Sequence, residues 1–135
     1  MNTEHQVIGY LDKLVLICDD EESYTKFLSK IIDKYLKARV LVATDPGVMF
    51  EVLKSENPDL IILDLQMPVM DGEKALKVLR EDHVHNSVPV LICSALGFES
   101  TIVNLAKLNI DGFIIKPFEA TTVIQKIQTI LDKQR

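Results

Sequence analysis

Hydrophobic residues in this chain follow two patterns: short unbroken runs, and longer stretches in which they recur every three or four residues. An unbroken run of branched side chains is typical of a strand that is buried on both faces. Five such runs occur, each bounded by polar or turn-forming residues. The sequence therefore predicts strands at residues 14–18, 40–43, 60–63, 90–93 and 113–115.

The stretches between these runs have the spacing of amphipathic helices. The first predicted helix carries its apolar side chains at Tyr24, Phe27, Leu28, Ile31, Ile32, Tyr35 and Leu36. Asp45 and Asp71 are suited to cap the second and third helices, which are expected to end at Asn57-Pro58 and at Glu81. The fourth helix is predicted over residues 99–108. The fifth has its apolar positions at Val123, Ile124, Ile127, Ile130 and Leu131.

Strands and helices thus alternate through most of the chain. Repeats of strand, helix and strand pack as a parallel sheet with helices on both faces, which places the chain in the α/β class. A length of 135 residues suffices for one hydrophobic core but hardly for two. Because residues 1–13 lack clear periodicity, we expect an N-terminal extension at 1–13 and a single domain at 14–133.

The overall charge argues against two classes of partner. The chain has 20 acidic and 15 basic residues, a formal charge of -5, and no block of Lys and Arg. Attraction to nucleic acid or to an anionic membrane therefore has no electrostatic basis. No apolar run reaches the roughly 18 residues of a spanning helix, and no signal-like segment opens the chain. We expect a cytoplasmic protein that binds other proteins or small anions.

The cysteines and two of the histidines have simple structural interpretations. Cys18 and Cys93 lie within apolar runs, where a free thiol behaves as a small core side chain, so neither a disulfide nor a redox role is expected. His83 and His85 lie in a polar connection and are expected on a surface loop rather than at a metal site.

Several polar residues end or directly follow the predicted strands. Asp19 and Asp20 follow the first strand, Asp64 the third, Ser94 the fourth and Lys116 the fifth. In parallel α/β sheets the carboxyl ends of the strands share one edge, and ligands bind there. We therefore expect these five side chains to lie together at one edge of the sheet.

The chemistry of these five side chains is complementary. Three neighbouring carboxylates repel one another, and a hard divalent cation such as Mg²⁺ is the usual partner of such a group. The backbone carbonyl of Gln66 is a further candidate ligand. A phosphoryl group beside the metal would need donors, and the Ser94 hydroxyl and the Lys116 ammonium are suitable. Asp64 would then act as the nucleophile and form an aspartyl phosphate.

In the order and spacing of these residues, the chain resembles the bacterial response-regulator receiver domains of two-component signalling and chemotaxis. The resemblance extends from Leu14 to about Leu131. It is carried by Asp19-Asp20, Asp64 with Met67-Pro68 and Met70-Asp71-Gly72, Ser94-Ala95, Phe113 and Lys116-Pro117-Phe118. The family implies a flavodoxin-like (βα)5 three-layer sandwich with a five-stranded parallel sheet in the order 2-1-3-4-5.

The resemblance also implies roles for the residues of the predicted site. Asp64 would accept a phosphoryl group from a sensor histidine kinase or a histidine phosphotransfer protein. Mg²⁺ would be held by Asp19, Asp20, Asp64 and the carbonyl of Gln66. Lys116 would pair with Asp64 before phosphorylation and with the phosphoryl group afterwards.

A switch and an output surface are implied as well. Ser94 would move toward the phosphoryl group while Phe113 rotates inward. A downstream protein would then bind the face formed by the fourth helix, fifth strand and fifth helix, where Ile102, Phe113 and Ile115 are candidates. Tighter packing of the fourth helix and homodimerisation through this face are the open alternatives. Because the chain ends soon after the last helix, we expect a stand-alone receiver that acts as a phosphorelay intermediate or by direct protein binding.

Three further details follow from the resemblance. Gln66 and Leu96 lie two positions beyond Asp64 and Ser94, where the family controls the access of water to the phosphoryl group. A bulky apolar Leu96 is expected to slow hydrolysis. The peptide bond before Pro117 is expected to be cis.

Three other functions share the sheet or the nucleophile. A haloacid-dehalogenase-like phosphatase has a second Asp where this chain has Gln66, which argues against rapid turnover. A flavodoxin-like electron carrier needs a hydroxyl-rich phosphate loop where Asp19-Asp20-Glu21-Glu22 would repel a phosphate. A receiver-like module that is never phosphorylated would lack one of the acids, Ser94 or Lys116, and none is missing. We expect a phosphoacceptor signalling domain, not an enzyme, that assists its own phosphorylation and slow dephosphorylation.

Overall fold

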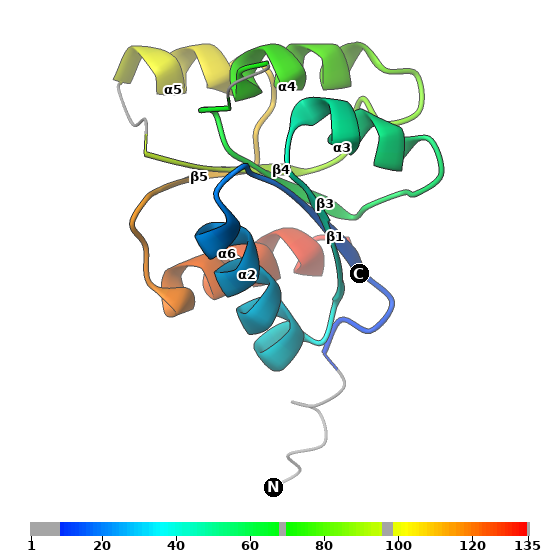
Figure 1. Cartoon of the computed structure of the whole chain (residues 1–135), viewed down its shortest axis with the longest axis vertical. Helices are drawn as coiled ribbons and strands as arrows, with labels where there is room; N and C mark the ends of the chain where they lie inside the picture. Colours follow the sequence, from blue (N-terminus) through cyan, green and yellow to red (C-terminus); the bar gives the residue numbers. More distant parts are fainter. Residues whose placement is uncertain (1–8, 68–69, 96–98, 135) are drawn as a thin grey trace, which may run out of the picture.

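Five parallel strands form one sheet with helices on both of its faces (Figure 1). The computed structural model describes residues 9–67, 70–95 and 99–134, and the side chains of all of these except residues 99–102. The strands lie in the order β2-β1-β3-β4-β5. Their bounds are Leu14–Cys18 for β1, Arg39–Ala43 for β2, Leu60–Leu63 for β3, Val90–Ser94 for β4 and Gly112–Ile115 for β5. The α/β class and the strand order implied by the resemblance are thus confirmed.

The helices divide between the two faces, as Figure 1 shows. One face is covered by α2 (Glu22–Ile31), its π-helical continuation η1 (Ile32–Leu36) and α6 (Ala120–Asp132). The other face is covered by α3 (Pro46–Leu53), α4 (Gly72–Glu81) and α5 (Glu99–Ala106). The sheet is thus the middle layer of a three-layer sandwich.

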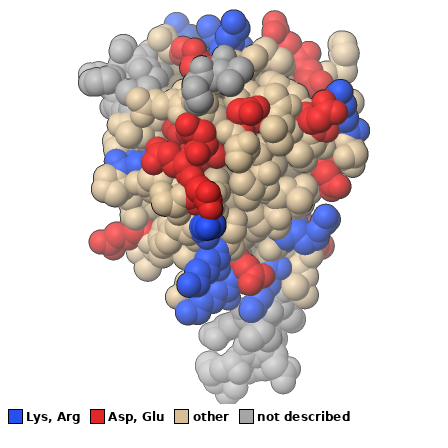
Figure 2. All heavy atoms as spheres, viewed as in Figure 1, with Lys and Arg blue, Asp and Glu red and all other residues tan. Residues whose placement is uncertain are grey.

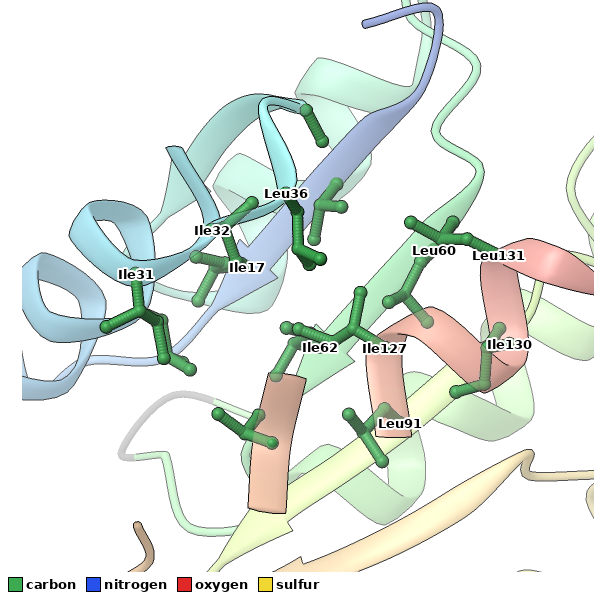
Figure 3. Packing of buried hydrophobic residues seen from close by; sticks show 14 of the residues in the cluster. Ile17, Ile31, Ile32, Leu36, Leu60, Ile62, Leu91, Ile127, Ile130 and Leu131 are labelled. Atoms are coloured by element: carbon green, nitrogen blue, oxygen red, sulfur yellow. The ribbon is translucent and has the colours of Figure 1, made fainter. Parts of the chain in front are cut away.

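Alternate side chains of each central strand point to opposite faces and build two separate cores. In β1, Val15 and Ile17 join the core under α2 and α6, whereas Leu16 and Cys18 join the core under α3 and α4. Figure 3 shows the first of these cores, with Ile17 of β1 on the same side as the apolar residues of η1 and α6. Burial on both faces explains why these strands appear in the sequence as unbroken apolar runs.

The first predicted helix is interrupted in a way that the apolar spacing did not indicate. After Ile31 the helix widens into a π-helix, in which the amide of Lys37 donates to the carbonyl of Ile32 at 3.0 Å. The wider turn keeps Ile32 and Leu36 buried but leaves Tyr35 54% exposed. The prediction that Tyr35 belongs to the buried stripe is therefore wrong.

Two helices end earlier than predicted. The second helix ends at Leu53 rather than at Asn57-Pro58, and the fourth ends at Ala106 rather than at Leu108. At the end of α5 the guanidinium of Arg80 donates to the carbonyls of Leu108 at 2.8 Å and Asn109 at 2.9 Å. Arg80 thereby satisfies carbonyl groups beyond the last helical turn and ties α4 to the end of α5.

The packed region begins before the first strand. Tyr10 is 8% exposed and belongs to the core under α2 and α6. Its hydroxyl donates to Asp132 Oδ1 at 2.7 Å, and its amide donates to the carbonyl of Leu36 at 2.8 Å. In the described part of the chain, no helix has the length and apolar character that crossing a membrane requires.

Candidate functional site

Asp19, Asp20, Asp64 and Lys116 meet at the carboxyl edge of the sheet, and Ser94 ends the neighbouring strand β4. The ladder of backbone hydrogen bonds continues just past the strands and aligns their ends. The amide of Asp64 donates to the carbonyl of Cys18 at 3.0 Å, and the amide of Lys116 donates to the carbonyl of Ser94 at 2.9 Å. Residues that are far apart in the sequence are thereby held side by side by the register of the sheet.

Three carboxylates form a tight acidic cluster at this edge. Asp19, Asp20 and Asp64 each contribute an oxygen, and these oxygens all lie within 4.8 Å of one another. Asp19 and Asp64 are each 2% exposed, whereas Asp20 is exposed to solvent. Figure 2 shows acidic side chains gathered on the surface over the beginning of α2, next to this cluster.

Lys116 lies inside the acidic cluster and is itself only 7% exposed. Its ammonium Nζ is 2.7 Å from Asp19 Oδ2 and 3.4 Å from Asp64 Oδ2. Burial lowers the pKa of Lys116, but the hydrogen bond and charge of Asp19 raise it more, so the net shift is upward. The neighbouring carboxylates thus favour the charged ammonium form of Lys116.

The donor set fits a hard divalent cation. One ammonium faces several carboxylates, so the cluster keeps an excess of negative charge even with Lys116 in place. Burial raises the pKa of Asp19, and the hydrogen bond from Lys116 opposes that rise. Oxygen ligands with excess negative charge are what Mg²⁺ prefers, so Asp19, Asp20 and Asp64 are the residues that could hold it. The carbonyl of Gln66 stays a prediction, while its amide donates to Asp64 Oδ1 at 3.2 Å.

Gly72, which the sequence analysis included only as part of a motif, lies against the backbone of Asp64. Its amide donates to the carbonyl of Leu65 at 2.9 Å. A Cβ atom at this position would overlap the carbonyl oxygen of Asp64 and lie 2.6 Å from Leu65 Cα. Only a glycine therefore allows α4 to begin this close to the loop that carries the candidate nucleophile.

We expect Gly72→Ala to destabilise the fold by about 3 kcal/mol, because the added methyl group meets backbone atoms that cannot rotate away. Denaturant unfolding measures the change. Gly47→Ala in α3 is the matched control, because its Cβ would meet only a carboxylate oxygen of Asp45, which can move, and Ala favours the helix. Equal stabilities of the two variants would contradict this explanation.

The two predicted switch residues occupy neighbouring strands. Ser94 is the last residue of β4 and is fully buried, while Phe113 on β5 is half-buried and packs against the core under α3 and α4. Their movement stays a prediction. The Lys116–Pro117 peptide is cis, as the resemblance implied. The predicted residues Pro68 and Leu96 lie outside the described residues, as does the side chain of Ile102.

Two residues of α2 and its N-cap take part in the site although sequence analysis did not place them there. Glu21 Oε1 is 3.3 Å from Lys116 Nζ, and the ring of Tyr24 has its centroid 4.1 Å from the same ammonium. The Tyr24 ring in turn lies 5.6 Å from the ring of Phe118. The only signal in the sequence was that Glu21 directly follows the aspartate pair.

The prediction that both cysteines are core side chains is confirmed, whereas the surface position expected for His85 is wrong. Cys18 and Cys93 are buried free thiols, and burial raises the pKa of each to about 12. His83 is exposed, as predicted. His85 is only 8% exposed, because its Nε2 lies 2.7 Å from the carbonyl of Leu53, a contact between segments that the sequence could not place together.

Comparison with known proteins places this geometry in a family. The chain matches the family model of the response regulator receiver domain over residues 15–128. It is 30% identical to the chemotaxis protein CheY of Bacillus subtilis over 118 residues, which are 87% of this chain and 97% of that protein. It is 25% identical to the hybrid signal transduction histidine kinase D of Dictyostelium discoideum, over 90% of this chain but 8% of that protein.

Solved structures agree with these matches. The receiver domain of the Francisella response regulator 1452 superposes with a TM-score of 0.83 at 26% identity, covering 91% of this chain and 99% of that one. The chemotaxis protein CheY4 of Vibrio cholerae superposes with a TM-score of 0.80 at 25% identity, covering 88% of this chain and 98% of that one. Both similarities extend over nearly the whole of each relative.

Proposed function

Because the chain belongs to the family of response regulator receiver domains, we propose that it accepts a phosphoryl group on Asp64 from a sensor histidine kinase or a histidine phosphotransfer protein. Receiver domains are signalling domains of two-component systems. The observation that supports Asp64 is its position. It is a buried carboxylate within reach of the Lys116 ammonium and inside a cluster of acids that could hold a metal.

In the proposed reaction an oxygen of Asp64 attacks the phosphorus of a phosphohistidine. The P–N bond breaks, its electron pair stays on the imidazole nitrogen, and the product is an acyl phosphate on Asp64. Mg²⁺ held by Asp19, Asp20 and Asp64 would neutralise charge on the phosphoryl oxygens. Lys116 would donate to one of these oxygens, and the Ser94 hydroxyl would donate to another once it has moved toward the group.

This reaction needs positioning and charge neutralisation more than a separate base. The chain has Gln66 where a haloacid-dehalogenase-like phosphatase has its acid and base residue, so we propose slow hydrolysis of the acyl phosphate rather than rapid turnover. Under this proposal the protein serves as a phosphoacceptor that assists its own phosphorylation and dephosphorylation.

A downstream protein would bind the face formed by α5, β5 and α6, with a second copy of the chain as the alternative partner. Two observations support this face. Ile115 on the edge strand is 52% exposed. A hollow of about 440 Å³ lies beside it, lined by Phe113, Ile115 and Phe118 among others. An exposed apolar side chain next to a hollow is a common feature of protein interfaces.

The test is incubation of the protein with acetyl phosphate, with Mg²⁺ or with a chelator, followed by intact-mass measurement. We expect the mass to increase by one phosphoryl group with Mg²⁺ and not to increase with the chelator. Absence of an adduct under both conditions would favour a module that is never phosphorylated. Rapid hydrolysis of a phosphomonoester substrate would favour the phosphatase.

A further inference from the structure

We propose that Glu21 is a positioning residue for Lys116. Before phosphorylation the Glu21 carboxylate pairs with the Lys116 ammonium, and it then competes with the incoming phosphoryl group for that ammonium. The inference rests on the proposed function and adds a residue that controls the rate at which Asp64 is phosphorylated. Glu21 is not one of the acids of the candidate metal cluster, and its carboxylate reaches Lys116 from the N-cap of α2.

The geometry around the ammonium supports this role. Lys116 Nζ has three carboxylate partners, at 2.7 Å for Asp19, 3.3 Å for Glu21 and 3.4 Å for Asp64. Glu21 and the proposed nucleophile therefore lie at about the same distance from the ammonium. The ring of Tyr24, one turn further along α2, also contacts this ammonium, with its centroid 4.1 Å from Nζ.

The exposure of the three partners separates their roles. The side chains of Asp19 and Asp64 are 3% and 1% exposed, whereas that of Glu21 is 53% exposed. Glu21 thus reaches the ammonium from the solvent side, where a phosphodonor must arrive. A carboxylate in this position acts in two ways. It repels an approaching anion, and it retains an ammonium that the phosphoryl oxygens need.

The backbone next to Glu21 fixes its approach. Its amide donates to Asp19 Oδ1 at 2.9 Å, while the other oxygen of Asp19 accepts from Lys116 at 2.7 Å. Asp19 thereby holds both members of the Glu21–Lys116 pair. Because Glu21 is bonded to Lys116 only through an exposed carboxylate, this contact is the one of the three that can open without uncovering a buried charge.

The experiment compares Glu21→Gln with Glu22→Gln. Both variants remove one negative charge from adjacent, exposed positions, but Glu22 pairs with Lys26 at 2.6 Å instead of with Lys116. We expect phosphorylation by acetyl phosphate with Mg²⁺ to be about threefold faster in Glu21→Gln than in Glu22→Gln, the size expected for a half-exposed ion pair. The nitrogen NMR signal of the Lys116 ammonium should shift in Glu21→Gln and not in Glu22→Gln.

Each outcome decides between distinct possibilities. Equal rates in the two variants would overturn the inference, because the loss of any negative charge near the site would then have the same effect as the loss of the Glu21–Lys116 contact. A slower rate in Glu21→Gln would also overturn it, because Glu21 would then assist the reaction. An unchanged Lys116 signal would show that the ion pair is absent in solution. A wild-type protein that never takes up the phosphoryl group would instead overturn the proposed function, which is a different result from equal rates.

Discussion

Asp64→Asn is expected to abolish the Mg²⁺-dependent uptake of a phosphoryl group while leaving the fold intact. An amide oxygen is a far weaker nucleophile than a carboxylate, and the substitution also removes one of the charges that would hold the metal. The shape of the side chain hardly changes. Asn can still accept the hydrogen bond from the amide of Gln66, which is 3.2 Å from Asp64 Oδ1. Intact-mass measurement after incubation with acetyl phosphate checks the result.

The control for this variant is Asp33→Asn, which removes the same charge from an exposed position on η1. It should be phosphorylated as fast and as completely as the wild-type protein. Unfolding in denaturant should show that the Asp64→Asn variant is folded. Persistence of the adduct in folded Asp64→Asn protein would place the phosphorylated residue elsewhere and remove the basis for the proposed function.

Lys116→Met should destabilise the protein by about 3 kcal/mol in the absence of Mg²⁺ and should also slow phosphorylation strongly. Without the ammonium, Asp19 and Asp64 remain as buried carboxylates, each 2% exposed, with no opposite charge at 2.7 Å and 3.4 Å. The loss should be no larger than this, because Asp20 at the edge of the cluster is exposed to water. Denaturant unfolding with a chelator measures the loss.

Mg²⁺ should restore more stability to Lys116→Met than it adds to the wild-type protein, because the cation then has no ammonium to compete with. Lys54→Met is the matched control. It removes a lysine from an ion pair of 3.0 Å with Glu51 whose side chains are 72% and 71% exposed, so its effect on stability should be small and independent of Mg²⁺. If Mg²⁺ stabilises Lys116→Met and Lys54→Met by the same amount, Lys116 does not compete with the metal. If Mg²⁺ stabilises neither variant, the acidic cluster does not bind it.

Much of the site was predictable from the sequence for a simple reason. Each functional residue ends or follows an apolar run, and the carboxyl ends of parallel strands share an edge whatever the order of the strands. Asp19, Asp64 and Lys116 could therefore be grouped before any coordinates were known. Their individual distances could not, because the 2.7 Å contact of Lys116 with Asp19 joins residues 97 positions apart and depends on how the sheet twists and packs.

The residues that sequence analysis misplaced or missed have separate physical causes. Tyr35 lies outside the buried stripe because a π-helical turn changes the angle between successive side chains. No pattern in the local sequence indicated that turn. His85 is buried because its ring Nε2 hydrogen-bonds with the carbonyl of Leu53 at the end of α3, a contact that spans 32 positions of the sequence. Glu21 joins the site through its contact with Lys116, which no helical periodicity could reveal.

The sequence by itself determined the alternation of strands and helices, the parallel sheet and the edge at which the acids gather. The alternation follows from the different apolar periods of strands and helices, and the sheet follows because repeats of strand, helix and strand pack in parallel. Only the tertiary structure decided which carboxylates share Lys116, that Gly72 touches the backbone of Asp64, and that Arg80 ties α4 to α5. The contacts of Glu21 and Arg80 join segments that are distant in the chain, and all three contacts depend on packing across the whole fold rather than on any local pattern.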